Sequence, residues 1–255
     1  MITLSEVDLM AWLSPVIWPF LRTLAVFTSA PVFSSKAFPV RARIALAFFI
    51  ALAAQPALGQ QPVISMTSPG AIGAVMQQVG VGLAIGFAIR LVFAAVELAG
   101  EVVGFQMGLS FASFFDPSFN TQSSAVARFF GQMAIFMFIV MNGHFLVLMT
   151  VINSFKSFPV DQNFLTAVKQ MKVLNLGADL FASGLWMALP MVGMLMFANL
   201  ALGIVSRVAP QMNIYAIGFP ITLTVGLVGM ATTLPMLDQP FLALMTRAID
   251  IFAAI

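Results

Sequence analysis

Long apolar runs separated by short polar breaks make up most of this chain. The runs far exceed the 4–8 residues of a typical strand, and most reach the roughly 20 residues that a helix needs to cross a bilayer. We therefore predict an all-α, polytopic, membrane-type protein with about six hydrophobic helical segments. They are residues 9–33, 44–58, 70–104, 125–153, 178–206 and 214–234, and a short amphipathic tail follows Pro240.

Prolines inside these runs predict kinked helices. Pro15 and Pro19 lie four residues apart in the first run, and Pro190 lies in the middle of the fifth. A proline removes a backbone donor from a helix interior, which membrane helices tolerate where their neighbours satisfy the freed carbonyl groups. We expect kinked helical hairpins. The second run, residues 44–58, is short for a full crossing.

The positions of the basic residues conflict with a topology in which every apolar run crosses the membrane. Lys36, Arg41 and Arg43 form the densest basic cluster, and the positive-inside rule places that cluster in the cytoplasm. If the second, third and fourth runs all cross, the loop 155–172 lies outside although it holds three more lysines. Either one run does not cross, or the helices do not form a conventional bilayer-spanning bundle.

Composition supports the membrane assignment. Of the 255 residues, 61% are hydrophobic and 8% are charged, with a mean hydropathy of +1.03. A soluble domain carries about 25% charged residues, so this chain lacks the polar surface that water requires. The net charge is +2 and the basic residues are spread out, so the sequence has no basic patch of the kind that binds nucleic acid. The acidic start of the chain argues against a cleaved signal peptide.

Enzyme and cofactor motifs are missing from the sequence. There is no cysteine, which excludes disulfides and Cys-ligated zinc. His144 is the single histidine, so a His-based metal site cannot form, and we expect a structural or hydrogen-bonding role for it. The glycines from Gly80 to Gly86 lie within a helical pattern without a preceding strand, which rejects a dinucleotide loop. We expect no catalytic activity, cofactor or metal ion.

Two patterns on the predicted helices indicate close contacts within a larger assembly. Arg90, Glu97 and Glu101 are spaced by seven and four residues, so they share one helix face. Charges at the centre of a bilayer are costly, and this charged helix face is either an internal ion-pair network or the wall of an aqueous conduit. Glycines four residues apart let membrane helices approach closely. These are Gly82 with Gly86, and Gly100 with Gly104 and Gly108.

Residues 104–124 fit neither a membrane span nor a solvated loop. The stretch is rich in Gly, Ser and Asn, yet it carries Phe111, Phe114, Phe115 and Phe119 beside Asp116. A protein-lined cavity or pore would shield the rings while the polar groups stay wet. We therefore expect this Phe-rich segment to face a cavity.

Two motifs together resemble one family. The first runs from Gly108 to Asn120, and Arg128-Phe-Phe-Gly-Gln-Met-Ala and Asn142-Gly-His follow it. The second runs from Gly203 to Pro220 and contains Arg-x-x-Pro-Gln-x-Asn-x-x-x-x-Gly-Phe-Pro. Both resemble the FliR family of flagellar export-gate proteins, whose virulence-secretion counterparts are called SctT. The length, the segment pattern and the order of the motifs agree over essentially the whole chain.

This resemblance implies a pore-forming subunit of the type III export gate in the bacterial inner membrane, within the flagellar basal body. The expected partners are FliP-type and FliQ-type gate subunits, FlhB-type and FlhA-type export proteins, unfolded flagellar substrates and the lipid membrane. The resemblance also implies a single export-gate domain, residues 1–255, with a FliP-like part, 1–153, and a FliQ-like part, 154–255. A family complex held largely outside the bilayer plane would resolve the topology conflict.

Within that family, the segment corresponding to residues 106–124 plugs the closed pore. The candidate plug residues are Phe111, Phe114, Phe115, Asp116, Pro117 and Phe119. A ring of Phe dewets a constriction, and the flanking glycines permit movement. We also expect a turn at a subunit interface, formed by Arg207, Pro210, Gln211 and Asn213.

Two alternatives remain open from the residues alone. A secondary solute transporter would use Arg90, Glu97 and Glu101 as a coupling site beside broken helices. It predicts inverted repeats, which the sequence does not display, and activity of the isolated chain. A purely structural membrane scaffold predicts instead that the Phe-rich segment can be removed without effect.

Overall fold

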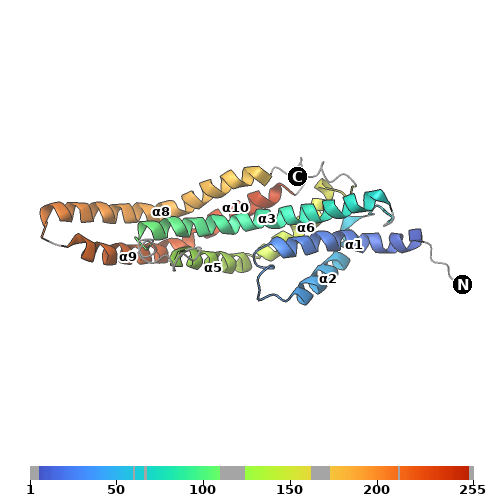
Figure 1. Cartoon of the computed structure of the whole chain (residues 1–255), viewed down its shortest axis with the longest axis horizontal. Helices are drawn as coiled ribbons and strands as arrows, with labels where there is room; N and C mark the ends of the chain where they lie inside the picture. Colours follow the sequence, from blue (N-terminus) through green and yellow to red (C-terminus); the bar gives the residue numbers. More distant parts are fainter. Residues whose placement is uncertain are drawn as a thin grey trace. The chain divides into compact units, whose positions relative to one another are not determined.

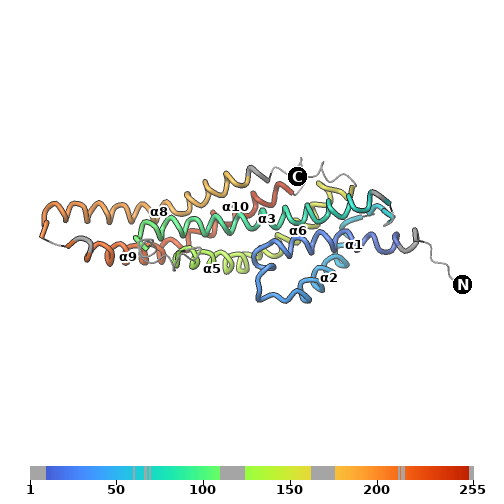
Figure 2. Tube along the Cα trace, viewed as in Figure 1, coloured from blue at the N-terminus to red at the C-terminus, as the bar shows by residue number. Residues whose placement is uncertain are grey.

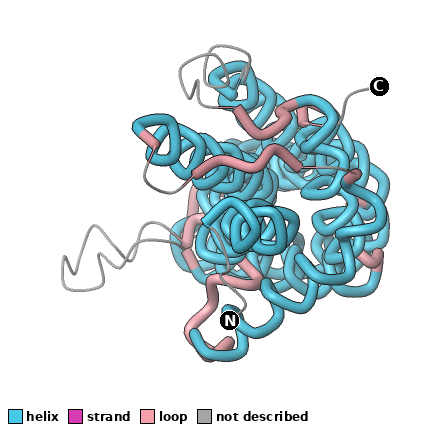
Figure 3. Tube along the Cα trace, turned by 90° about the vertical axis from the view of Figure 1, so that its right-hand side faces the viewer, coloured by secondary structure: helices cyan, strands magenta, loops and turns pink. Residues whose placement is uncertain are grey.

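A computed structural model describes residues 6–59, 61–65, 68–109, 124–161, 173–211 and 213–252. Figure 1 labels the elements, Figure 2 traces the chain, and Figure 3 shows helices and loops without strands over these residues. Eight α-helices and a short 3₁₀-helix are formed by the described residues. They are α1 (Glu6–Ser29), α2 (Val40–Leu58), α3 (Pro69–Gln106), α5 (Ala125–Val140), α6 (Gly143–Ser157), α8 (Val173–Val208), α9 (Ile214–Thr233), η2 (Leu234–Met236) and α10 (Asp238–Asp250).

The predicted fold class is confirmed. Five of the described helices are long and apolar enough to cross a membrane, and the kinked pair α5 and α6 raises this to six when it is counted as one span. The turn around Pro210 separates α8 from α9, and the amphipathic tail forms α10. The expectation that these helices do not build a conventional bilayer-spanning bundle stays a prediction.

The prediction of one continuous helix over residues 125–153 is wrong. The backbone breaks at Asn142, which adopts a left-handed conformation with φ 57° between α5 and α6. Asn tolerates this region better than other residues that carry a side chain, and Gly143 follows it directly. The apolar composition hid this break, because both halves are apolar enough to form one continuous run.

The predicted boundary of the second run is also wrong. Helix α2 begins at Val40, directly after Pro39, and includes Arg41 and Arg43 in its first turns. Proline disrupts the interior of a helix but is tolerated at its beginning. Pro39 therefore marks the start of α2. At 19 residues α2 has the length of a candidate span. The expectation that this segment is too short to cross was therefore wrong.

The described chain divides into two compact units that interleave along the sequence. Unit 1 comprises residues 1–91, 142–176 and 245–255, and unit 2 comprises residues 92–141 and 177–244. Helix α3 runs through both, because the unit boundary falls after Leu91. The split near residue 153, which rests on the order of the apolar runs and on the family resemblance, stays a prediction.

Unit 1 encloses a buried cation. Arg22 on α1 is fully buried, and its guanidinium lies 3.6 Å from the centroid of the Phe155 ring. Its N–H groups donate hydrogen bonds to three neutral acceptors. They are Gln78 Oε1 on α3 at 2.9 Å, Ser154 Oγ on α6 at 2.9 Å and the Phe158 carbonyl oxygen at 2.8 Å.

The network continues from Gln78 towards the end of α6. Gln78 donates to Gln77 Oε1 over 2.9 Å, and Gln77 donates to the Pro159 carbonyl oxygen over 3.1 Å. The Asp161 amide donates back to Gln77 Oε1 over 2.8 Å. A buried polar group without a partner destabilises a fold by several kcal/mol, so these bonds hold α1, α3 and the chain after α6 in one arrangement.

Close packing of α1 on α3 accompanies this network. A Cβ atom at Gly82 would overlap the carbonyl oxygen of Arg22, and one at Gly86 would overlap the side chain of Ser29. Both glycines therefore lie where the two helices approach most closely. Trp18, Phe155 and Ile64 fill the apolar core beside this contact.

Unit 2 is built on the second half of α3. The Phe93 ring lies 5.6 Å from the Phe138 ring and 6.0 Å from the Phe241 ring, and all three side chains are buried. On α8, a Cβ at Gly184 would lie 2.8 Å from the Ala95 carbonyl oxygen. These contacts fix α5, α8 and α10 around the stretch of α3 that carries Glu97 and Glu101.

We predict that Arg22→Ala lowers the free energy of unfolding by about 3 kcal/mol, because it leaves three buried acceptors without a donor. Arg22→Lys should be only partly tolerated, since a lysine cannot reproduce the planar fork of donors. Thermal unfolding in detergent, followed by circular dichroism, measures both. Arg41→Ala, on the exposed side of α2, is the matched control. Equal melting temperatures for Arg22→Ala and Arg41→Ala would contradict the role of the network.

Candidate functional site

The central part of the Phe-rich segment, residues 110–123, lies outside the described residues. This applies to all the candidate plug residues, which are Phe111, Phe114, Phe115, Asp116, Pro117 and Phe119. The described residues on either side of it, Leu109 and Ser124, are both held on the last turns of α3. The candidate site is therefore built from the end of α3 and the helices of unit 2 that pack against it.

The residues before the segment are fixed against α9. The Thr222 hydroxyl donates to the Met107 carbonyl oxygen over 3.2 Å. Gly108 has φ +81°, a conformation that favours glycine, and a Cβ built there would lie 3.7 Å from the Phe219 ring. The Leu109 amide then donates to the Gly104 carbonyl oxygen over 3.2 Å, which closes the end of α3.

The residue after the segment is held by a carboxylate. The Ser124 amide donates to Glu101 Oε1 over 2.7 Å, and Ser124 Oγ accepts from the Ala127 amide over 3.1 Å. Ser124 is thus the N-cap of α5, and the negative charge of Glu101 lies at the positive end of that helix. Both effects stabilise the start of α5 at this point.

Glycines bring α3 and α5 together around this anchor. A Cβ at Gly100 would lie 2.7 Å from Ala127 Cα, and a Cβ at Gly104 would lie 2.9 Å from Ser124 Oγ. Each distance is shorter than ordinary van der Waals contact, so a larger residue would push the helices apart. The glycine spacing noted in the sequence therefore falls on this interface.

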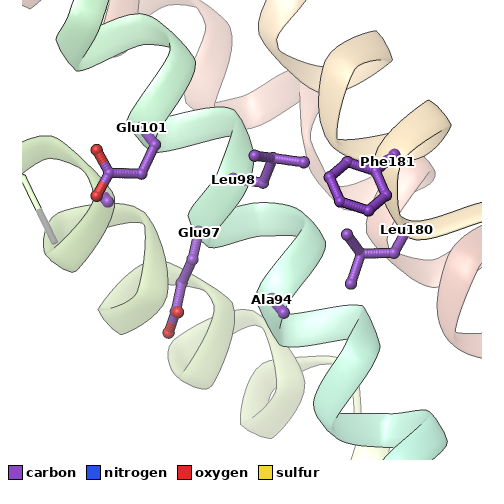
Figure 4. Close-up of a pocket in the computed structure, with 7 residues that line it drawn as sticks. Ala94, Glu97, Leu98, Glu101, Leu180 and Phe181 are labelled. Carbon is purple, nitrogen blue, oxygen red and sulfur yellow. The ribbon is translucent and has the colours of Figure 1, made fainter. Parts of the chain in front are cut away.

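A pocket of about 280 Å³ opens beside the anchor. Figure 4 shows the Glu97 and Glu101 side chains leaving one side of α3 and Leu98 leaving the other, near Leu180 and Phe181 of α8. The pocket is lined by Ala94, Glu97, Leu98, Glu101, Ala127, Leu180 and Phe181. Its walls are thus apolar, and both charged lining residues are acidic.

The three residues of the charged helix face have different surroundings. Arg90 is exposed and belongs to unit 1, whereas Glu97 and Glu101 belong to unit 2. Glu97 is exposed and lies over α5, where a Cβ at Gly131 would be 2.9 Å from its Oε1. Glu101 is half-buried and bonded to Ser124. Of the three, only Glu97 and Glu101 line the pocket.

The predicted turn at a subunit interface lies at the far end of α8. Arg207 lies in the last turn of α8 and is exposed, as are Pro210 and Gln211. Asn213 is the N-cap of α9 and accepts from the Ala216 amide over 3.4 Å. His144 lies half-buried at the start of α6, with its ring 4.3 Å from the Phe145 ring.

Sequence reasoning missed the residues that complete this site. Leu180 and Phe181 come from another helix, so no local pattern connects them with Glu97. Ser124 does have a sequence signal, because a serine directly before an apolar run is a typical N-cap. No group of three or more potential metal-binding side chains occurs among the described residues.

Comparison with known proteins gives consistent matches over the chain. Residues 13–248 match the family model described as "Bacterial export proteins, family 1". The chain is 37% identical over 257 residues to the flagellar biosynthetic protein FliR of Pectobacterium carotovorum subsp. carotovorum, covering 100% of this chain and 97% of that protein. It is 37% identical over 243 residues to the FliR protein of Escherichia coli (strain K12), covering 94% and 92%. The FliR protein of Bacillus subtilis (strain 168) is 31% identical over 212 residues, covering 82% of each.

We predict that Glu101→Ala speeds hydrogen exchange at the Ser124 amide by roughly tenfold or more, since a hydrogen bond to a charged group contributes about 1.5–3 kcal/mol. Glu101→Gln keeps an acceptor oxygen without the charge and should give an intermediate rate. Hydrogen–deuterium exchange of the purified protein, resolved over residues 124–130, measures this. Unchanged exchange in Glu101→Ala would show that the carboxylate does not hold this end of the segment.

A second prediction concerns the α3–α5 contact. Gly100→Ala should lower the free energy of unfolding by about 1–3 kcal/mol, because the new methyl group overpacks the interface. Gly193→Ala on α8 is the matched control, since a Cβ there meets nothing within 4 Å and alanine favours a helix by up to about 1 kcal/mol. Melting temperatures in detergent compare the two. A Gly100→Ala protein as stable as Gly193→Ala would argue against tight packing here.

Proposed function

Because this chain belongs to the FliR family of bacterial export proteins, we propose that it is a pore-forming subunit of the flagellar type III export gate. It is a flagellar export protein of the bacterial inner membrane with several membrane helices, and not an enzyme. The relatives compared above are flagellar proteins. The proposal extends this to the pore, its plug and the partners.

The proposed partners are the FliP-type and FliQ-type gate subunits, with FlhB-type and FlhA-type export proteins nearby. The surface of unit 2 supports an assembled state, because it carries many exposed large apolar side chains. On α8 alone, Phe181, Trp186 and Phe197 are 67%, 73% and 78% exposed. Lipid or protein has to cover such a surface, and a subunit of a membrane complex is covered by both.

The observation that carries the pore proposal is the anchoring of both flanks of the Phe-rich segment on one helix end. Leu109 is bonded to Gly104, and Ser124 is bonded to Glu101, so residues 110–123 connect two fixed points on α3. A plug needs two anchored ends of this kind, because it seals the pore only if those ends keep their positions. We propose that Phe111, Phe114, Phe115 and Phe119 close the pore, with Asp116 and Pro117 between them.

Unfolded flagellar proteins are the proposed substrates. Phenylalanine rings close a narrow pore to water and ions by dewetting it, and an entering chain would displace them. No nucleotide-binding loop is present in the sequence, so the energy for transport would come from another component. Family membership also removes the support for a solute transporter based on Arg90, Glu97 and Glu101.

We predict that deletion of residues 110–119 makes the assembled gate leak ions, because the apolar seal is lost. Double substitution of Phe114 and Phe115 by Ser should leak as well, whereas substitution of both by Leu should not, since leucine also repels water. Conductance of the purified complex in planar bilayers measures this. Co-purification of the FliP-type and FliQ-type partners with each variant is the control for assembly. Unchanged conductance in complexes that retain those partners would contradict the plug.

A further inference from the structure

We infer that the basic end of the hairpin formed by α1 and α2 binds the headgroup of an anionic phospholipid, whose acyl chains lie along α2. The basic end comprises Lys36 in the connection between the two helices, and Arg41 and Arg43 in the first turn of α2. This inference goes beyond the proposed function and does not depend on it, because it concerns the contact of one hairpin with the membrane. Charge, apolar surface and helix length each point to this ligand.

The three cations of the basic end lack an anion within the described part of the chain. The side chains of Lys36 and Arg41 are exposed, and neither makes an ion pair or a hydrogen bond there. Arg43 donates one long hydrogen bond, from Nη2 to the Phe38 carbonyl oxygen over 3.5 Å, and its buried Nε has no partner. Arginine donors that are not used within the chain can turn towards a phosphate, which accepts them in pairs.

The place of these cations on α2 is unfavourable unless an anion is bound. The N-terminal end of a helix carries a positive partial charge, so it favours acidic and not basic side chains. The first turn of α2 holds Arg41 and Arg43 and no acidic residue, and no side chain forms a capping hydrogen bond after Pro39. A phosphate at this point would be attracted by the basic side chains and by the free N–H groups of the first turn together.

An exposed apolar surface continues from the basic end along α2. The buried side of this helix is made of small residues, Ala47, Ala51 and Ala54. Large apolar side chains after the basic end are exposed instead, and they are Ile44, Leu46, Phe48, Phe49 and Leu52. Such a surface has to be covered by apolar groups. A phospholipid supplies an anionic headgroup and apolar chains in the same order as α2 presents its charges and its apolar side, whereas free phosphate would leave that side uncovered.

The length of the hairpin places its basic end at the level of lipid headgroups. The Phe20 and Phe48 rings lie 6.4 Å apart, nine residues before the end of α1 and eight after the start of α2, so the two helices are antiparallel neighbours. The candidate spans have 20 and 19 residues, which is about 30 Å of helix and matches the hydrocarbon core. Trp12, 84% exposed, lies towards the opposite end, as tryptophans at a membrane interface do.

The first experiment measures lipid binding to the purified full-length chain by native mass spectrometry. We expect dioleoyl phosphatidylglycerol to bind more tightly than dioleoyl phosphatidylcholine, because only the first has a net negative charge. Each basic residue near an anionic surface contributes roughly fivefold in affinity. Arg41→Gln should therefore weaken phosphatidylglycerol binding about fivefold, and the triple substitution of Lys36, Arg41 and Arg43 by Gln about 100-fold.

Two controls accompany these variants. Arg128→Gln removes an exposed arginine of α5, outside the hairpin, and should leave the affinity for phosphatidylglycerol unchanged. Lys36→Arg combined with Arg41→Lys and Arg43→Lys keeps all three charges and should keep the preference for the anionic lipid. Equal binding of both lipids by the wild-type chain, or a preference that survives the triple Gln substitution, would overturn the inference.

The second experiment locates the lipid on the complete gate complex in nanodiscs of phosphatidylcholine and phosphatidylglycerol. Phosphatidylglycerol with a photoreactive group in one acyl chain should label the stretch from Ile44 to Leu52, as read by peptide mass spectrometry. Phosphatidylcholine with the same acyl chain should label it less. A photoreactive phenylalanine analogue at position 49 should cross-link to lipid. Cross-links from that position to a partner subunit, or displacement of the labelled lipid by inorganic phosphate, would contradict a phospholipid site.

Failure of this inference is distinguishable from failure of the proposed function. The first experiment needs only the purified chain, so its result stands whether or not the chain assembles into an export gate. Loss of lipid preference in a complex that retains its partners would leave the gate proposal intact. If the triple Gln variant is not recovered as a folded chain, the comparison of Arg41→Gln with Arg128→Gln decides.

Discussion

A charge removed from water has to find its partners within the protein, and this requirement shapes both units. In unit 1, the Arg22 guanidinium donates to the Phe158 carbonyl oxygen at the C-terminal end of α6. In unit 2, the Glu101 carboxylate accepts the Ser124 amide at the N-terminal end of α5. The cation thus lies at a negative helix end and the anion at a positive one, which is the favourable arrangement for each helix dipole. The two ends are the outer ends of the broken pair α5 and α6, so each half of that pair has its own charged anchor.

The sequence predicts the helices well because their apolar runs are long, and it fails where a single residue decides the backbone. The span from 214 is recovered to within one residue, as α9 ends at Thr233. The break at Asn142 is missed, because both sides are apolar and only the left-handed conformation of one residue separates the helices. Arg22 and Glu101 were visible as charges, yet the partners of Arg22 lie 56, 132 and 136 residues away and that of Glu101 lies 23 residues away. Such contacts depend on tertiary packing, which no local pattern contains.

The broken pair bears on the conflict between the charge rule and the count of crossings. Helix α5 has 16 residues and α6 has 15, so each alone is shorter than the roughly 20 residues of a crossing. A pair that enters and leaves on one side would put Lys156 on the same side as Arg41 and Arg43, as the positive-inside rule requires. This is the first of the two solutions that the sequence left open. The second, helices held outside the bilayer plane, is the one that the family resemblance implies.

The two carboxylates of the pocket have separate roles on adjacent turns of α3. Glu101 accepts a hydrogen bond from the Ser124 amide and so anchors one end of the Phe-rich segment. Glu97 is exposed and lies over α5 beside Gly131. Residues four apart on a helix have Cβ atoms about 5–6 Å from each other. The hydrogen bond that holds the start of α5 therefore depends on Glu101, although Glu97 lies only one turn away on the same helix.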